Sequence, residues 1–232
     1  MIQRPRLARS ALLCSALLSL APLPALAAAA TEDAVSTRSF YLQLITQARI
    51  DGRARAALAY LDDFDRRYPR DPEATVLRVN SLLDIGDVDA AEVAASALPS
   101  SGNNGDGSVS AVRGHLLAAR GRWREAIPFY QAAVGTRPTD ALLRNALGYA
   151  QLRAGLGGEA VETLRGAAAL APSDAVIRNN LLLALTMSGR QAEARAALQT
   201  IADTEQRNRL SRQIAAEATR IATRSPHQEN SR

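Results

Sequence analysis

A glycine recurs along this chain at nearly constant spacing, and this periodicity limits the possible folds more than any other feature. The spacings are 34, 35, 34 and 34 residues, and an alanine follows each glycine five positions later. At an ordinary glycine frequency of about 7%, such a register arises by chance about once in 10⁴ to 10⁵ trials. A fixed period of this length is typical of stacked structural repeats. The glycines are Gly52, Gly86, Gly121, Gly155 and Gly189, and the alanines are Ala57, Ala91, Ala126, Ala160 and Ala194.

Each repeat is predicted to form two helices, as the unit 141–174 illustrates. Asp140 can cap the first helix, because its carboxylate accepts a backbone N–H of the first turn. Gly155 is expected to end that helix in a left-handed conformation, and the second helix runs to Pro172. Gly148 and Ala160 are predicted to face each other, so that the two helices approach closely. Apolar residues at helical spacing mark the buried faces: Leu143, Leu147 and Ala150, then Ala160, Leu164 and Ala167.

The composition agrees with an all-helical chain. Alanine makes up about one residue in five, and aromatic residues only 4%. Alanine is the strongest helix former, whereas strands favour β-branched and aromatic residues. An all-β sandwich or barrel is therefore disfavoured. A helix pair cannot bury its apolar face alone, so the repeats are expected to stabilise one another by stacking.

These residues resemble the tetratricopeptide repeat family. In the fourth unit the resemblance rests on Leu147, Gly148, Gly155, Ala160, Leu164, Ala167 and Pro172, and the third unit carries Gly114, Gly121, Ala126, Tyr130, Ala133 and Pro138 at the same positions. The resemblance covers about residues 38–207. It implies an all-α, right-handed α-solenoid of about five helix-turn-helix units, followed by a C-terminal capping helix. It also implies a concave face that binds a peptide or a partner protein.

The predicted organisation follows from this register. N-terminal repeat-like units one and two occupy residues 31–106, and units three to five occupy 107–208. A low-complexity stretch from Pro99 to Ser108 interrupts the array, and the second helix of unit two is expected to end early there. The amphipathic segment 209–224 is the predicted capping helix, and residues 225–232 are a predicted disordered tail.

Residues 1–27 have the pattern of a secretory signal peptide. Arg4, Arg6 and Arg9 precede a short apolar run that ends in small residues. Cleavage is predicted after Ala27, with Ala30 as the alternative. The mature protein is therefore expected in the periplasm, without a transmembrane helix. An outer-membrane lipoprotein anchored through Cys14 is the less favoured alternative, because Leu13 stands where a lipid-attachment box needs a small residue.

Composition and motifs disfavour catalysis, metal binding, cofactor binding and nucleic-acid binding. The formal net charge of +5 falls to +2 without the three arginines of the signal, which removes the support for nucleic-acid binding. The chain has two histidines, one cysteine and no lysine, so zinc-peptidase and phosphate-binding motifs are absent. We predict no catalytic residues, no metal site and no cofactor.

The partner-binding groove is predicted on the first helices of the repeats. Asparagine amides at such positions can both donate to and accept from a peptide backbone, and Arg153 can bind a carboxylate in a two-pronged contact. Structural roles are the alternative for several of them, above all packing by Tyr149 and Leu152 and a solvated His115. The candidates, carried over from the family's groove positions, are Asn80, His115, Asn145, Tyr149, Leu152, Arg153, Asn179, Leu183 and Met187.

The last repeats suggest a more specific resemblance. The stretch from Pro172 to Ala194, with its asparagine pair, is similar to TadD-type proteins of tight-adherence (Flp) pilus systems. That resemblance implies a non-enzymatic periplasmic scaffold that helps to assemble a type IVb pilus or its secretin. Two alternatives stay open: a scaffold subunit of exopolysaccharide or cell-envelope machinery, and an adaptor that presents substrates to a separate peptidase.

Overall fold

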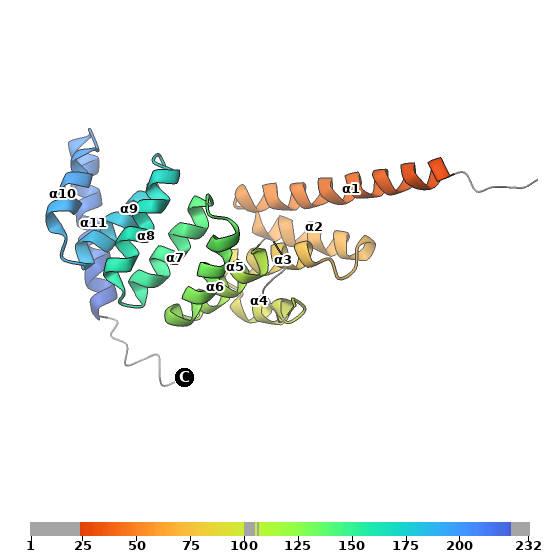
Figure 1. Ribbon diagram of the computed structural model, residues 1–232, viewed down its shortest axis with the longest axis horizontal. Coiled ribbons are helices and arrows are strands. Elements are labelled where there is room, and N and C mark those ends of the chain that lie inside the picture. The colour runs from red at the N-terminus through yellow and green to blue at the C-terminus, as the bar shows by residue number, and fades with distance from the viewer. Residues whose placement is uncertain (1–23, 100–104, 106, 224–232) are drawn as a thin grey trace, which may run out of the picture. The chain divides into compact units, whose positions relative to one another are not determined.

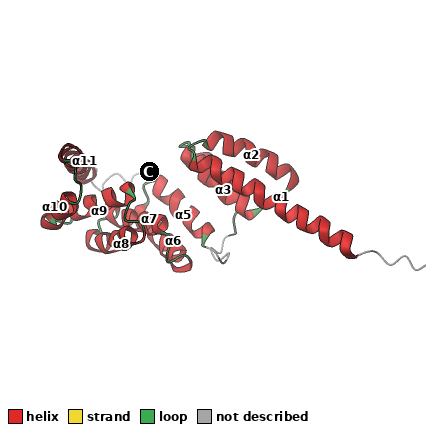
Figure 2. Cartoon of the chain, turned by 90° about the horizontal axis from the view of Figure 1, so that it is seen from above, coloured by secondary structure: helices red, strands yellow, loops and turns green. Residues whose placement is uncertain are grey.

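The computed structural model describes residues 24–99, 105 and 107–223, with side chains from residue 37 onward. These described residues contain eleven α-helices and no strand (Figures 1 and 2). Cys14, the tail 225–232 with His227, and most of the predicted signal peptide lie outside them. The helices are α1 (Pro24–Ile50), α2 (Ala54–Arg67), α3 (Pro72–Asp84), α4 (Val88–Ala95), α5 (Ser108–Ala119), α6 (Trp123–Thr136), α7 (Ala141–Arg153), α8 (Gly157–Leu170), α9 (Ala175–Met187), α10 (Gln191–Gln199) and α11 (Thr204–Thr223).

The chain divides into two units, 1–39 and 40–232, and the boundary falls inside α1. The first unit contains the start of α1 and both predicted cleavage positions. The second unit contains the rest of α1 and all the later helices. None of the described helices is both long enough and apolar enough to cross a membrane.

The five predicted helix pairs are present, and their turns form as the glycine period predicts. The pairs are α1 with α2, α3 with α4, α5 with α6, α7 with α8, and α9 with α10. Each of the five periodic glycines has a positive φ, between 73° and 82°, which an L-residue rarely adopts. Asp140 caps α7 as predicted, because its Oδ1 accepts the backbone N–H of Leu143 at 3.0 Å.

Small residues set the distance between the helices of a pair. A Cβ atom on Gly148 would lie 2.6 Å from Cγ of Leu164, so α7 and α8 could not pack as they do with a larger side chain there. The sequence predicts Ala160 opposite Gly148, and the atoms nearest to that Cβ position belong to Leu164, one helical turn further along α8. Gly114 makes the same kind of close approach to the ring of Tyr130.

The array continues across the low-complexity stretch. The second helix of unit two, α4, ends early, as predicted, at Ala95. The apolar faces of α3 and α5 nevertheless share one core cluster, in which Val79, Val109 and Val112 are at most 1% exposed. Valine packing between first helices therefore holds units two and three together.

The C-terminal helix is longer than predicted and occupies a different place. It begins at Thr204 rather than near residue 209. It packs mainly against α9 and little against the shortened α10. Ile214, Ala218 and Ile221 contact a core cluster built from α7, α8, α9 and α10. The helix thus covers part of the face formed by the first helices, where the sequence predicts the groove.

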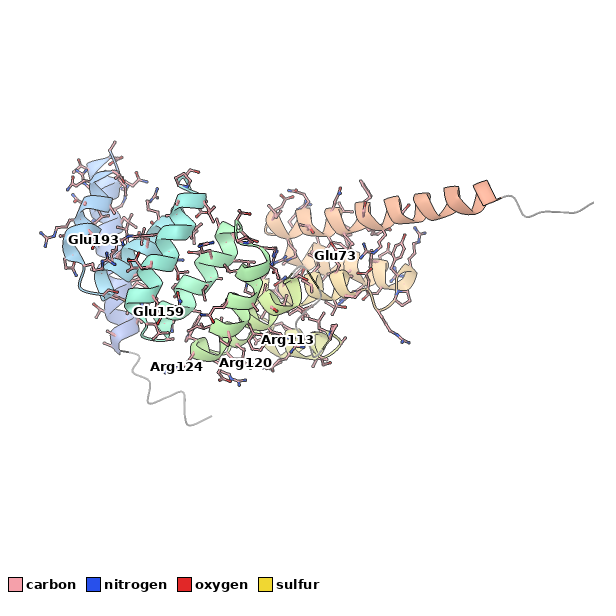
Figure 3. All side chains as sticks on the ribbon, viewed as in Figure 1. Glu73, Arg113, Arg120, Arg124, Glu159 and Glu193 are labelled. Carbon is pink, nitrogen blue, oxygen red and sulfur yellow. The ribbon has the colours of Figure 1, made fainter. Side chains whose placement is uncertain are left out.

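Arginines link the second helices along the surface. Arg190 contacts Glu162 of α8 at 2.9 Å and Glu193 of α10 at 2.6 Å, and Arg120 pairs with Asp89 and Glu92 of α4. Figure 3 labels Arg120 and Glu193, which lie in different parts of the array. Because the side chains are partly solvated, each pair contributes little to stability.

The turn glycines provide a direct test of this register. We expect Gly155→Ala to lower the free energy of unfolding by about 1 kcal/mol, because alanine is strained at a φ of +82°. No atom lies within 4 Å of the added Cβ, so the effect is one of backbone conformation alone. Urea denaturation followed by circular dichroism measures it.

Gly135→Ala is the matched control for this change. Gly135 is exposed in the last turn of α6, with open space around its Cβ position and no positive φ. Alanine there should leave stability unchanged or raise it slightly. Equal destabilisation by both substitutions would contradict the left-handed turn.

Candidate functional site

A cavity lies between the first helices and α11. Its volume is about 580 Å³, and five helices line it: α5, α6, α7, α9 and α11. We call it the amide groove, after the asparagines that line it. Its lining includes Trp123, Asn145, Tyr149, Asn179, Asn180, Leu183, Gln213, Glu217 and Arg220.

Three asparagines form the polar wall of the amide groove. Asn180 Nδ2 donates to Asn145 Oδ1 at 2.9 Å, which joins α9 to α7. This contact leaves the Nδ2 donor of Asn145 and the Oδ1 acceptor of Asn180 for other partners. The Oδ1 atom of Asn179 is buried and finds no hydrogen-bond donor among the described residues. A buried amide oxygen without a donor is costly.

An aromatic pair forms one edge of the amide groove, and the guanidinium of Arg153, which is not among the lining residues, stacks on this pair. The rings of Trp123 and Tyr149 meet edge to face, with centroids 5.6 Å apart. The guanidinium of Arg153 lies 4.4 Å from the centroid of Trp123 and 5.9 Å from that of Tyr149. Stacking holds a guanidinium in place while leaving its N–H edge able to bind a carboxylate. Arg153 makes no ion pair within the described part of the chain.

Helix α11 supplies the opposite wall, which the sequence analysis did not assign to the groove. Gln213, Glu217 and Arg220 line the cavity, and the last two form an ion pair at 2.9 Å. The amphipathic pattern of this helix is visible in the sequence. The sequence does not show which face of the array this helix packs against, because a terminal cap and an inner wall would bury the same apolar residues. Trp123, the first residue of α6, also lines the groove.

The structure places some of the predicted groove residues in the amide groove and others in the core. Asn145, Tyr149, Asn179 and Leu183 line the groove, although Leu183 is only 3% exposed. Leu152 takes the packing role that the sequence left open: it is 3% exposed and lies in a core cluster with residues of α8 and α9. Met187 packs against the same core cluster as the apolar face of α11.

Asn80 and His115 form a separate pair outside the amide groove. His115 Nδ1 lies 3.2 Å from Asn80 Oδ1, within hydrogen-bond distance. The imidazole also lies 5.5 Å from the ring of Tyr130. Burial lowers the pKa of His115 from 6.5 to about 4, and the nearby positive charge of Arg49 acts in the same direction. His115 is therefore neutral at pH 7 and links α3 to α5.

The described residues contain no group of three or more His, Cys, Asp or Glu side chains that could hold a metal ion. The features of the amide groove are hydrogen-bonding amides, aromatic surface and an arginine edge. Such an arrangement can bind an extended peptide backbone and one carboxylate.

His115 gives a pH prediction. Its pKa in the folded state is below that of the unfolded chain, so its contribution to stability is full above about pH 6.5 and is lost as the pH falls toward 4. We expect His115→Gln to reduce this loss between pH 7 and pH 5. NMR titration, with His227→Ala used to assign the second histidine, should give a pKa near 4 for His115. A value near 6.5 would contradict its burial against α6.

The comparisons with known proteins agree with this architecture. The profile of the tetratricopeptide repeat family matches residues 48–104 and 112–175, which together are just over half of the chain. No curated protein sequence matches the chain.

Several solved structures share the fold. The Thermus thermophilus protein TTC0263, described as a thermophilic tetratricopeptide repeat protein, superposes with a TM-score of 0.62 at 22% identity, over 77% of this chain and 97% of that one. Pseudomonas aeruginosa pilF gives a TM-score of 0.61 at 17% identity, over 81% of this chain and 88% of that one. MamA from Desulfovibrio magneticus RS-1 gives a TM-score of 0.55 at 21% identity, over 76% of this chain and 96% of that one. At these identities the likeness shows the fold alone. The family profile and the five turn glycines together establish that this chain belongs to the tetratricopeptide repeat family.

Proposed function

We propose that this protein is a non-enzymatic scaffold that binds an extended peptide segment of a partner protein in the amide groove. The carrying observation is the wall of three asparagines, Asn145, Asn179 and Asn180, that lines the groove. The hydrogen bond between Asn180 and Asn145 leaves the Nδ2 donor of Asn145 and the Oδ1 acceptor of Asn180 for a partner. A peptide backbone presents the complementary alternation of N–H and C=O groups. Tetratricopeptide repeat domains bind protein partners, and this groove is suited to such a contact.

Arg153 adds a preference to this site. Its guanidinium is stacked on Trp123, which lines the groove, although Arg153 itself is not a lining residue. Because a planar guanidinium binds a carboxylate through two parallel hydrogen bonds, the favoured peptides carry an aspartate, a glutamate or a terminal carboxylate there. The family's lysine-based carboxylate clamp does not apply, since this chain has no lysine.

We further propose that the protein is exported to the periplasm and takes part in assembling a Flp-type (type IVb) pilus or its secretin. The basic, apolar and small-residue segments of residues 1–27 support export. The similarity of residues 172–194 to TadD-type proteins supports the pilus assignment. The fold is also that of Pseudomonas aeruginosa pilF, a likeness that supports the proposal through the fold alone.

The groove residues allow a test of both proposals. The protein is purified from the periplasm after cross-linking, and the yield of pilus secretin is compared between Asn179→Ala and wild type. Loss of the Asn179 amide removes up to two hydrogen bonds, each contributing about 1 kcal/mol, so we expect at least a fivefold weaker association. The recovered secretin should fall accordingly.

Asn208→Ala is the matched control. Asn208 is exposed on α11 and is not part of the amide groove, so its substitution should leave recovery unchanged. Equal loss with both variants, or no loss with Asn179→Ala, would contradict the groove as the binding site. Recovery of polysaccharide-export components in place of pilus components would contradict the pilus assignment and leave the groove intact.

A further inference from the structure

A second hollow lies away from the amide groove, and exposed aliphatic side chains line it. Its volume is about 680 Å³, and its walls come from α1, α2, α3 and α7. Ile50, Ile85 and Leu142 line it and are 73%, 37% and 65% exposed. Large aliphatic side chains gathered in one hollow on a protein surface are typical of a contact site. We call this hollow the arginine pocket.

Arginines surround these aliphatic side chains. Arg49, Arg53, Arg55 and Asp84 are the charged lining residues, so the lining carries a net charge of +2. Asp84 holds Arg49 through Nε at 2.9 Å, and Asp51 holds Arg53 at 2.6 Å. These contacts fix two guanidinium groups at the rim. Arg55 lies in the first turn of α2, is exposed, and makes no ion pair within the described residues.

We propose that the arginine pocket is a second docking surface, which takes an acidic segment of a partner protein that carries one large apolar side chain. The apolar side chain would cover Ile50, Ile85 and Leu142, while flanking Asp or Glu residues meet the arginine rim. A second copy of this chain fits less well. A two-fold contact through this pocket would bring the same arginines against one another.

The peptide specificity of the purified protein tests this surface even though the partner is unidentified. A random 12-residue peptide library displayed on phage is selected on wild type, and the selected peptides are synthesised. Their affinities are measured by fluorescence anisotropy for wild type, for Ile50→Ser/Leu142→Ser and for Arg55→Glu. We expect a class of peptides with Asp or Glu beside a Leu, Ile or Phe, which bind each of these variants at least tenfold more weakly.

Matched controls separate pocket effects from general surface effects. Val93→Ser/Val176→Ser removes two equally exposed aliphatic side chains, 74% and 61% exposed, outside the pocket. Arg195→Glu reverses an exposed charge on α10. Neither should change the affinity of this peptide class. Its affinity should fall as salt rises from about 50 to 500 mM, since partly exposed charges are screened.

The outcomes distinguish this surface from the amide groove. Peptides that bind the arginine pocket should bind Asn179→Ala as tightly as wild type, whereas groove peptides should not. The proposal is overturned if every selected peptide depends on Asn179, if no peptide is selected, or if the peptides that need Ile50 and Leu142 are neutral or basic. Loss of acidic peptides from the Val93→Ser/Val176→Ser control would also overturn it.

Discussion

The close approach of paired helices at small side chains is the constraint on which the rest of this structure depends. Ala57, Ala91, Ala126, Ala160 and Ala194, the five periodic alanines, are at most 4% exposed. Gly148 admits Leu164 where a methyl group would clash. Close packing keeps the two helices of each unit near each other, and the left-handed glycine turns give each unit the same turn conformation. The asparagines of successive first helices can therefore lie side by side on one face. The amide groove is a consequence of this spacing.

Local features of the fold could be predicted from the sequence because they depend on residues close together in the chain. The turn at Gly155 and the cap at Asp140 each involve one helix end. Because the repeats share one sequence pattern, the helices of one unit predict those of the next. The residue predicted opposite Gly148 lies one turn away from Leu164, whose atoms are nearest to that Cβ position. Both Ala160 and Leu164 lie on the buried face of α8, and the sequence pattern does not specify the relative shift of two paired helices.

The site could be predicted only in part, because its geometry depends on contacts between distant segments. Asn145 and Asn179 are identified by their register positions, and the structure places both in one cavity. For Leu152 the sequence left groove and core roles open, because an apolar residue at a groove position can turn into the core, as it does here. The α11 wall could not be predicted because its position depends on the short α10, which leaves α9 as its main support. A periodic pattern cannot predict where the array stops being periodic.

The central claim is that a partner segment lies between α9 and α11 in the amide groove, and site-specific photocross-linking measures this most directly. A benzophenone amino acid is placed at position 213, whose glutamine lines the groove, or at the neighbouring position 212, whose arginine is exposed outside it. Our account predicts a covalent adduct with the partner from position 213 and none from position 212. Equal adducts from both positions, or an adduct from position 212 alone, would contradict it.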